Sequence, residues 1–138
     1  MSAPPVVKAF LICDYVIHEQ ETNKKSCIGI FHQINAPSFP CRHGQLSIYA
    51  NITNALGDYA FRLSLVHLRD EKEIGSGATP SLKIPDKLQT AELAFRLQNI
   101  VFPQEGKYEF RLHANDRLIA QKEVAVIPTG GQGGRPAG

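Results

Sequence analysis

Tryptophan is absent from this sequence of 138 residues, and only one methionine and three cysteines are present. An odd number of cysteines does not make a complete disulfide framework, and their spacing matches no common one. We therefore expect reduced thiols and a cytoplasmic protein. The absence of tryptophan also weakens a carbohydrate-binding interpretation, because tryptophan is the side chain that most often stacks on sugars.

Neither sign of charge dominates: 15 Lys and Arg oppose 13 Asp and Glu, which leaves a net charge of +2. Nucleic-acid-binding proteins usually concentrate basic residues on one face, so we expect no nucleic-acid partner. No apolar run approaches the roughly 18–20 residues that a membrane-spanning helix requires. The first five residues, Met-Ser-Ala-Pro-Pro, lack the basic and apolar parts of a signal peptide. We therefore expect neither export nor membrane insertion.

The most informative stretch covers residues 91–112, AELAFRLQNIVFPQEGKYEFRL. Apolar residues alternate from Leu93 to Leu97, as in a strand with one buried face. Tyr108 begins the next strand pattern, and Phe110 stands two positions beyond it, where antibody domains place a disulfide cysteine. This is the spacing of a tyrosine corner, in which a tyrosine hydroxyl bonds to upstream backbone in an immunoglobulin-like sandwich. We predict this structural role for Tyr108.

The rest of the sequence has the pattern of an all-β protein. Apolar and polar residues alternate over 46–53 and 61–65, a break is expected at 75–77, and no segment has a helical period. Asn115–Asp116 is predicted as a two-residue hairpin turn, because both residue types tolerate positive φ. We predict an immunoglobulin-like antiparallel β-sandwich of seven to nine strands. The domain limits are an N-terminal arm 1–5, a sandwich domain 6–128 and a disordered Gly-rich tail 129–138.

An extra hairpin is predicted near the N-terminus. Residues 6–17 and 26–34 have strand composition and are separated by turn-forming residues. Apolar residues occupy both alternating faces of the two strands, so we expect both faces to be covered. Gly29 within the second strand indicates a bulge or a close approach of backbone. A loop with two prolines is expected at 35–44.

The candidates for chemistry are Asp14, Cys27, His32, Cys41 and His43. The cysteines and histidines lack the C-x₂-C and H-x₃₋₅-H pairs of common zinc sites, and cysteines in apolar strands behave as small hydrophobic residues. For Asp14 we favour a structural interpretation, in which its carboxylate faces outward or accepts hydrogen bonds from backbone amides at a bulge. An enzyme would require these side chains to meet within hydrogen-bond reach in one cleft. We expect no catalytic residue, no cofactor and no metal.

Four aromatic residues are candidates for an interaction surface: Tyr15, Phe31, Phe39 and Tyr49. Core packing explains Tyr15 and Phe31 better than ligand contact does, whereas the alternation places Tyr49 on the solvated face of its strand. An exposed aromatic residue is also what a carbohydrate or small-molecule site would use. Such a site would lie around Tyr49 or in the loop 36–43.

Several short motifs together resemble one uncharacterised bacterial family of small soluble proteins, a domain of unknown function. The resemblance spans most of residues 8–127 and implies an immunoglobulin-like sandwich. It implies no substrate, cofactor or site residue. The motifs that carry it are CDYVI (Cys13–Ile17), IGIF (Ile28–Phe31), APSFP (Ala36–Pro40) and GKYEFRL (Gly106–Leu112).

The function expected from the sequence is that of a non-catalytic protein-interaction or scaffold module. The N-terminal hairpin carries more apolar surface than a sandwich strand needs to cover one face. We therefore expect a protein partner or a homodimer to bind through this hairpin. The alternative is a carbohydrate- or small-molecule-binding module, and an enzyme ranks third.

Overall fold

The structure, a computed structural model, describes residues 4–129. Most of the predicted arm 1–5 and tail 129–138 lies outside these residues. The described part contains eleven strands and no helix, and hence no helix that could cross a membrane. The strands are β1 Val6–His18, β2 Lys25–Ile30, β3 Gln33–Ala36, β4 Cys41–Thr53, β5 Gly57–Tyr59, β6 Phe61–His67, β7 Lys72–Ala78, β8 Leu82–Ile84, β9 Ala91–Phe102, β10 Gly106–Ala114 and β11 Arg117–Pro128.

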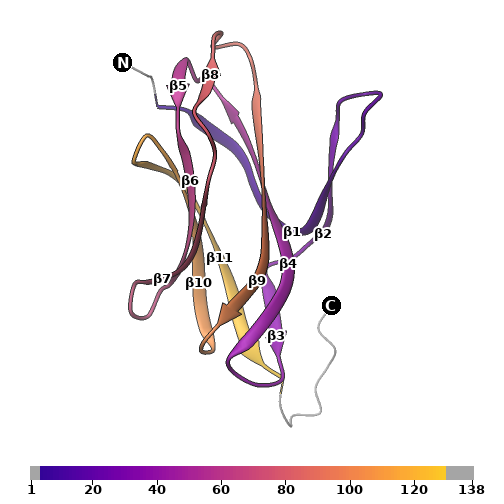
Figure 1. Ribbon diagram of the computed structural model, residues 1–138, viewed down its shortest axis with the longest axis vertical. Helices are drawn as coiled ribbons and strands as arrows, with labels where there is room; N and C mark the ends of the chain where they lie inside the picture. Colours follow the sequence, from indigo (N-terminus) through magenta and orange to yellow (C-terminus); the bar gives the residue numbers. More distant parts are fainter. Residues whose placement is uncertain (1–3, 130–138) are drawn as a thin grey trace.

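Nine of these strands form two sheets that face each other, as Figure 1 shows. The strand orders are β2-β1-β4-β9 and β3-β11-β10-β6-β7, while β5 and β8 form a separate small ribbon. All neighbours in the two large sheets are antiparallel except β3 and β11, which are parallel. An immunoglobulin sandwich groups strands A, B and E in one sheet and C, F and G in the other. Here β1, β4 and β9 occupy the first set of positions and β6, β10 and β11 the second, so the predicted fold class is confirmed.

The hydrophobic core lies between the two sheets and follows from the period-2 pattern of the strands. In β4, the side chains of Leu46, Ile48, Ala50 and Ile52 are fully buried, whereas those that alternate with them face the outer side of the sheet. The alternation of β9 breaks at Asn99, which has a positive φ of 54°, and Ile100 then returns to the core. Other buried members come from every layer: Ile12, Phe61, Leu63, Leu65, Phe95, Phe102, Phe110, Leu112, Val124 and Val126.

The tyrosine corner joins the two sheets between β9 and β10. The Tyr108 hydroxyl donates to the carbonyl of Gln104 at 2.5 Å and accepts from the Gln104 amide at 3.3 Å. Its ring lies edge-on to Phe102 and stacks on His67, with ring centroids 4.9 and 4.5 Å apart. The predicted role of Tyr108 is therefore confirmed, and both neighbours fix the ring so that its hydroxyl reaches the main chain.

The predicted N-terminal hairpin exists, but its second strand is shorter than expected. The sequence predicted one strand over 26–34, whereas β2 ends at Ile30 and the chain crosses to the other sheet as β3. The amide of Phe31 donates to the carbonyl of Ile12, which keeps the chain on β1 up to the crossing point. β3 then pairs in parallel with β11. The prediction failed because this pairing joins segments far apart in the sequence.

Two other predicted boundaries are wrong. The loop expected at 35–44 is confined to 37–40, because β3 continues to Ala36 and β4 begins at Cys41. The break expected at 75–77 is part of β7, where the glycines lie in an edge strand. The total of eleven strands exceeds the seven to nine predicted, although nine lie in the two large sheets. The peptide bond between Phe39 and Pro40 is cis.

The outer half of the β1–β2 hairpin stands out from the sandwich, as Figure 1 shows. β1 pairs with β4 only as far as Cys13, and beyond that point it pairs with β2 alone. Gly29 lies opposite Asp14 at this divergence and has a φ of +71°, and a Cβ on Gly29 would lie 2.3 Å from the Asp14 carboxylate. The space that a side chain at Gly29 would need is thus occupied by the carboxylate of Asp14, whereas the sequence predicted a bulge or a close approach of backbone. We call residues 14–30 the projecting hairpin.

Candidate functional site

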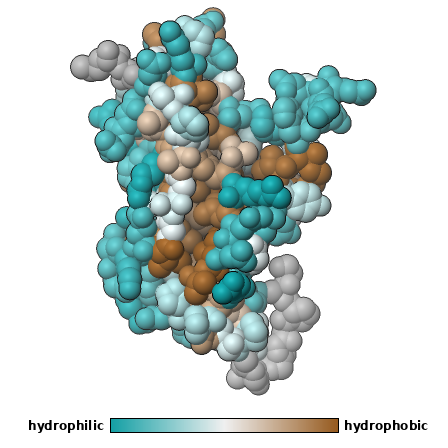
Figure 2. All heavy atoms as spheres, viewed as in Figure 1, coloured by the Kyte–Doolittle hydropathy of each residue, from teal (hydrophilic) through white to brown (hydrophobic). Residues whose placement is uncertain are grey.

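One face of the projecting hairpin is apolar and exposed. The register places Tyr15 opposite Ile28, and Ile17 lies two positions beyond Tyr15, so these three side chains share one face. Ile30 ends β2 opposite the buried Cys13. Exposure is 46% for Tyr15, 45% for Ile17, 37% for Ile28 and 60% for Ile30. In Figure 2, hydrophobic atoms gather on the hairpin below its hydrophilic tip. The expectation that both faces of the hairpin are covered is therefore wrong for a single chain. We call Tyr15, Ile17, Ile28 and Ile30 the outward face.

The other face of the projecting hairpin is turned toward the β2-β1-β4-β9 sheet and is half-buried. Val16, Lys25 and Cys27 lie on this face. The ammonium group of Lys25 contacts the carboxylate of Glu92 on β9 at 3.0 Å. Because Glu92 pairs with Asn51 near the far end of β4, the hairpin must bend back over the sheet to make this contact. The ion pair fixes the hairpin and leaves the outward face toward solvent.

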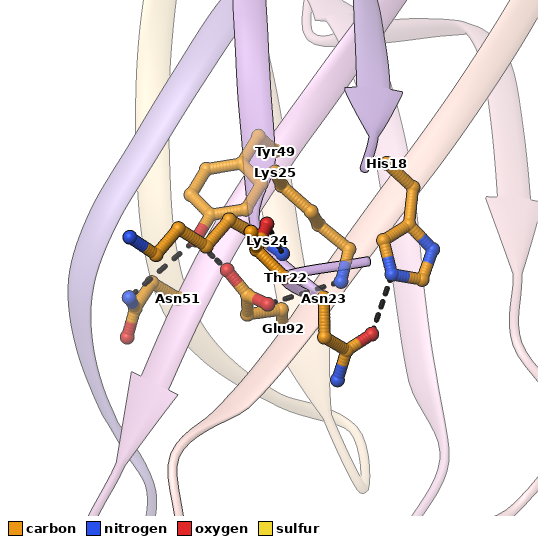
Figure 3. A network of polar contacts seen from close by, with 8 residues as sticks. All are labelled: His18, Thr22, Asn23, Lys24, Lys25, Tyr49, Asn51 and Glu92. Atoms are coloured by element: carbon orange, nitrogen blue, oxygen red, sulfur yellow. Dashed lines mark hydrogen bonds and ion pairs between the residues drawn. The ribbon is translucent and has the colours of Figure 1, made fainter. Parts of the chain in front are cut away.

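Glu92 is the centre of the polar network drawn in Figure 3. Its second carboxylate oxygen accepts a short hydrogen bond from the Tyr49 hydroxyl, and the Asn51 amide lies 3.5 Å from the same hydroxyl. The hydrogen bond from Tyr49, followed by the bond from Lys25, lowers the pKa of Glu92. Burial, followed by the bond to Glu92, raises the pKa of Tyr49 to about 12. Both shifts favour an ionised carboxylate beside a neutral phenol.

The lowered pKa of Glu92 predicts a hairpin that loosens in acid. A carboxylate with a lowered pKa in the folded state stabilises above its unfolded pKa, and this contribution is lost as the pH falls through the folded value. At pH 7 we expect amide hydrogen exchange at residues 19–27 to be about fivefold faster in Glu92→Gln than in the unsubstituted protein, after correction for intrinsic exchange rates. A fivefold change corresponds to the loss of an ion pair that contributes about 1 kcal/mol. In the unsubstituted protein the same acceleration is expected as the pH falls through the lowered pKa of Glu92, which lies below the ordinary glutamate value of about 4.3.

The matched control for this experiment is Glu123→Gln. Glu123 pairs with Lys107 at 3.5 Å on an exposed sheet surface far from the hairpin in the strand order. Exchange at residues 19–27 should not change in this variant. Equal exchange in Glu92→Gln and the unsubstituted protein would show that the ion pair does not hold the hairpin.

The four predicted aromatic residues lie in different environments. Tyr15 belongs to the outward face, whereas Phe31 and Phe39 are half-buried and pack against the core. Tyr49 lies on the outer side of its sheet, where its hydroxyl binds Glu92. The structure therefore does not bring the four together on one surface. Sequence reasoning missed Ile17, Ile28 and Ile30, although the register of the hairpin, once known, places them beside Tyr15.

The candidates for chemistry are only partly brought together. Asp14 and His43 line one open hollow of about 340 Å³ with Phe31, and neither His32 nor Cys41 is among its lining residues. The ring of His43 lies 5.9 Å from that of Phe31. Within residues 4–129, no three His, Cys, Asp or Glu side chains meet as a metal-binding group.

The three cysteines are free thiols. Burial is the main cause that raises the pKa of Cys13 to about 11, with Cys27 and Asp14 adding to it. Since the thiolate is the reactive form, this thiol is unreactive near neutral pH. The cytoplasmic location inferred from the cysteines stays a prediction.

Comparison with known proteins gives a family and a similar solved structure. A crystal structure of an immunoglobulin-like protein from Pseudomonas aeruginosa is similar to this chain, with 15% sequence identity and a TM-score of 0.39 over 90% of this chain and 97% of that one. The search of curated proteins found no match. Residues 8–127 match the model of a family described as a family of unknown function, DUF6941. This match covers most of the sandwich, and the chain therefore belongs to the DUF6941 family.

Proposed function

We propose that this chain is a non-catalytic protein-interaction module that self-associates through the projecting hairpin. The observation that carries the proposal is the outward face, on which four large apolar side chains are exposed together. Single exposed apolar residues are common on protein surfaces, whereas a contiguous group indicates an interaction site. The Lys25–Glu92 contact supports the proposal, because it orders the hairpin before any partner binds.

A second copy of the chain fits this face by symmetry. β2 is an edge strand of its sheet, so one side of its backbone is unpaired. Under a twofold axis, β2 strands of two copies run antiparallel and present the same residues to each other. A charged side chain on an edge strand disfavours pairing with another chain, but Lys25 forms an ion pair with Glu92 of its own chain. A dimer would thus extend the sheet and set Ile28 and Ile30 of one copy beside those of the other.

The magnitudes place such a dimer in the weak to moderate range. Full burial of a large apolar side chain contributes about 1.5–3 kcal/mol, so covering the exposed part of each gives about 1 kcal/mol. Two copies contribute Ile28 and Ile30 each, on the order of 4 kcal/mol in all, against an association cost of about 4–15 kcal/mol. Backbone pairing between the β2 strands is therefore required, and we expect a Kd on the order of 100 µM.

The proposal is tested by sedimentation equilibrium between about 5 and 500 µM chain. The unsubstituted protein should show a monomer–dimer equilibrium, and Ile30→Glu should weaken it at least tenfold, because it places a charge in the buried contact. Leu88→Glu is the matched control, since Leu88 is 91% exposed in the segment between β8 and β9. A monomer at every concentration, or equal dimerisation in both variants, would contradict the proposal.

Carbohydrate or small-molecule binding receives less support. Tyr49, the aromatic residue proposed for that role, is half-buried and its hydroxyl is bound to Glu92. A stacking platform requires an accessible ring face. The protein-interaction module is therefore the function that we favour.

A further inference from the structure

The sandwich is open along one side, where two edge strands border a cleft. β7 is the last strand of its sheet and β9 the last strand of the other, and a cleft of about 610 Å³ lies between them. Its floor includes the core residues Leu63, Leu65, Phe95 and Ile100. Figure 2 shows this as a hydrophobic stripe down the middle of the molecule. The volume falls within the range of about 300–1,000 Å³ that is typical of ligand pockets.

The β7 side of the cleft offers unpaired backbone groups. The amide of Thr79 donates to the carbonyl of Phe61, and pairs in an antiparallel ladder alternate between hydrogen-bonded and non-hydrogen-bonded. The hydrogen-bonded pairs of β6 and β7 are therefore Leu63 with Gly77 and Leu65 with Gly75. The N–H and C=O groups of Ser76 point away from β6 toward the free edge. An additional strand could pair with them without disturbing the sheet.

Between the bulge at Ile74 and Pro80, this edge lacks the devices that usually prevent strand addition. Edge strands are commonly protected by charges, prolines or bulges. The middle of β7 is Gly75, Ser76 and Gly77, with no charge and no proline. A Cβ at Gly75 would meet no atom within 4 Å, and one at Gly77 would only touch the Phe95 ring at 4.0 Å. The two glycines therefore leave space above the cleft floor for side chains of an incoming strand.

One charge at the cleft has no counterion. Arg96 lies on β9, lines the cleft and also lines a hollow of about 400 Å³ on the outer side of the same sheet. Among residues 4–129, no hydrogen bond or ion pair of its guanidinium group is present, in contrast to Arg62 and Arg111, which bind carboxylates. Arg96 alternates with the buried Phe95, so its side chain leaves the edge strand β9 on the outer side, beside the cleft. A guanidinium group without a counterion beside an apolar cleft is complementary to a carboxylate on the occupant.

We propose that the cleft between β7 and β9 binds an extended peptide segment of another protein by strand addition. The segment carries apolar side chains at alternate positions and a carboxylate that meets Arg96. Main-chain pairing to an exposed edge, with pockets for alternate side chains, is an established mode of peptide recognition. A single strand is favoured over a folded surface, because the floor of the cleft is core and lies between the two sheets. The carboxylate is either a side chain or a chain terminus.

The test uses three six-residue peptides that alternate Thr and Val: one with a free C-terminal carboxylate, one with a C-terminal amide, and one amide with a terminal Glu. Binding to the ¹⁵N-labelled chain is followed by NMR. We expect shifts concentrated at 74–80 and 94–101, and about fivefold tighter binding of the two carboxylate peptides, as for an exposed ion pair. The stronger of the two identifies the carboxylate source.

Two substitutions separate charge from backbone pairing. Arg96→Glu should reverse the preference, so that a peptide ending in Lys binds better than one ending in Glu. Ser76→Pro removes an outward N–H at an edge position and should weaken every peptide about tenfold, whereas Ser76→Ala keeps the N–H and should not. Ile30→Glu, on the projecting hairpin, should leave peptide binding unchanged, so the two proposals fail independently.

Three outcomes would overturn the peptide proposal. The first is the absence of shifts at both edges with 2 mM of every peptide. The second is equal binding of the amide and carboxylate peptides by the unsubstituted chain. The third is a set of edge shifts that depends on the concentration of the chain and not on peptide, because the occupant would then be a second copy.

Discussion

Replacement of Phe110 by alanine is expected to lower the free energy of unfolding by about 3–5 kcal/mol. Phe110 has no exposed surface and lies in β10, the central strand of its sheet. Truncation removes the transfer free energy of the ring and leaves a cavity, because neighbours on both sides are held in sheets. The loss is a large fraction of the 5–15 kcal/mol typical of single domains. Denaturation by urea, monitored by circular dichroism, measures it.

Two controls show whether the loss comes from the cavity. Phe110→Leu retains most of the volume and should cost clearly less than the alanine variant. Leu118→Ala, at a position that is exposed near the β10–β11 turn, should stay within about 0.5 kcal/mol of the unsubstituted protein. A change below about 1 kcal/mol in Phe110→Ala would contradict the packing described for the core.

The position of Phe110 explains why the sequence could predict the fold without a disulfide. In antibody domains the residue two positions after the corner tyrosine is a disulfide cysteine. Here an aromatic side chain fills that position, and the spacing to Tyr108 carries the signal in its place. The type of turn at Asn115–Asp116 was also predictable, and both residues have positive φ, 49° and 67°. These features are local, so composition and spacing suffice.

Features that depend on distant partners were not predictable in the same way. Apolar residues on both faces of the N-terminal hairpin indicated two covered faces, yet the pattern does not say that β1 leaves β4 after Cys13. The contact of Lys25 with Glu92 joins residues 67 positions apart. The cleft arises because no strand follows β9 in its sheet, which depends on where β7 and β8 pair. Strand order is set by competition between pairings, and no single segment encodes it.

Tyr59 also forms hydrogen bonds to backbone that the sequence pattern did not predict. The Tyr59 hydroxyl donates to the carbonyl of Leu56 at 3.0 Å and accepts from the Leu56 amide at 2.9 Å. These two hydrogen bonds resemble those of the Tyr108 hydroxyl, although Tyr59 lies at the end of β5, just before β6. The sequence analysis did not single out Tyr59, because its strand, β5, has only three residues and shows no alternation.

Substitution of Tyr108 by phenylalanine tests the corner itself. The change keeps the ring against Phe102 and His67 and removes only the hydroxyl, so the carbonyl and amide of Gln104 lose their partner. A buried polar group without a partner costs about 1–3 kcal/mol. We expect a loss of this size in the free energy of unfolding, measured by urea denaturation with an unchanged dependence on urea concentration.

Tyr15→Phe is the matched control, because Tyr15 is exposed and its change removes the same atom from the outward face. Its free energy of unfolding should change by no more than about 0.5 kcal/mol. Equal small changes in the two variants would mean that water replaces the Tyr108 hydroxyl at Gln104 without cost. The crossing from β9 to β10 would then be held by packing of the ring alone, and the hydroxyl would not be the element that fixes how the two sheets are joined.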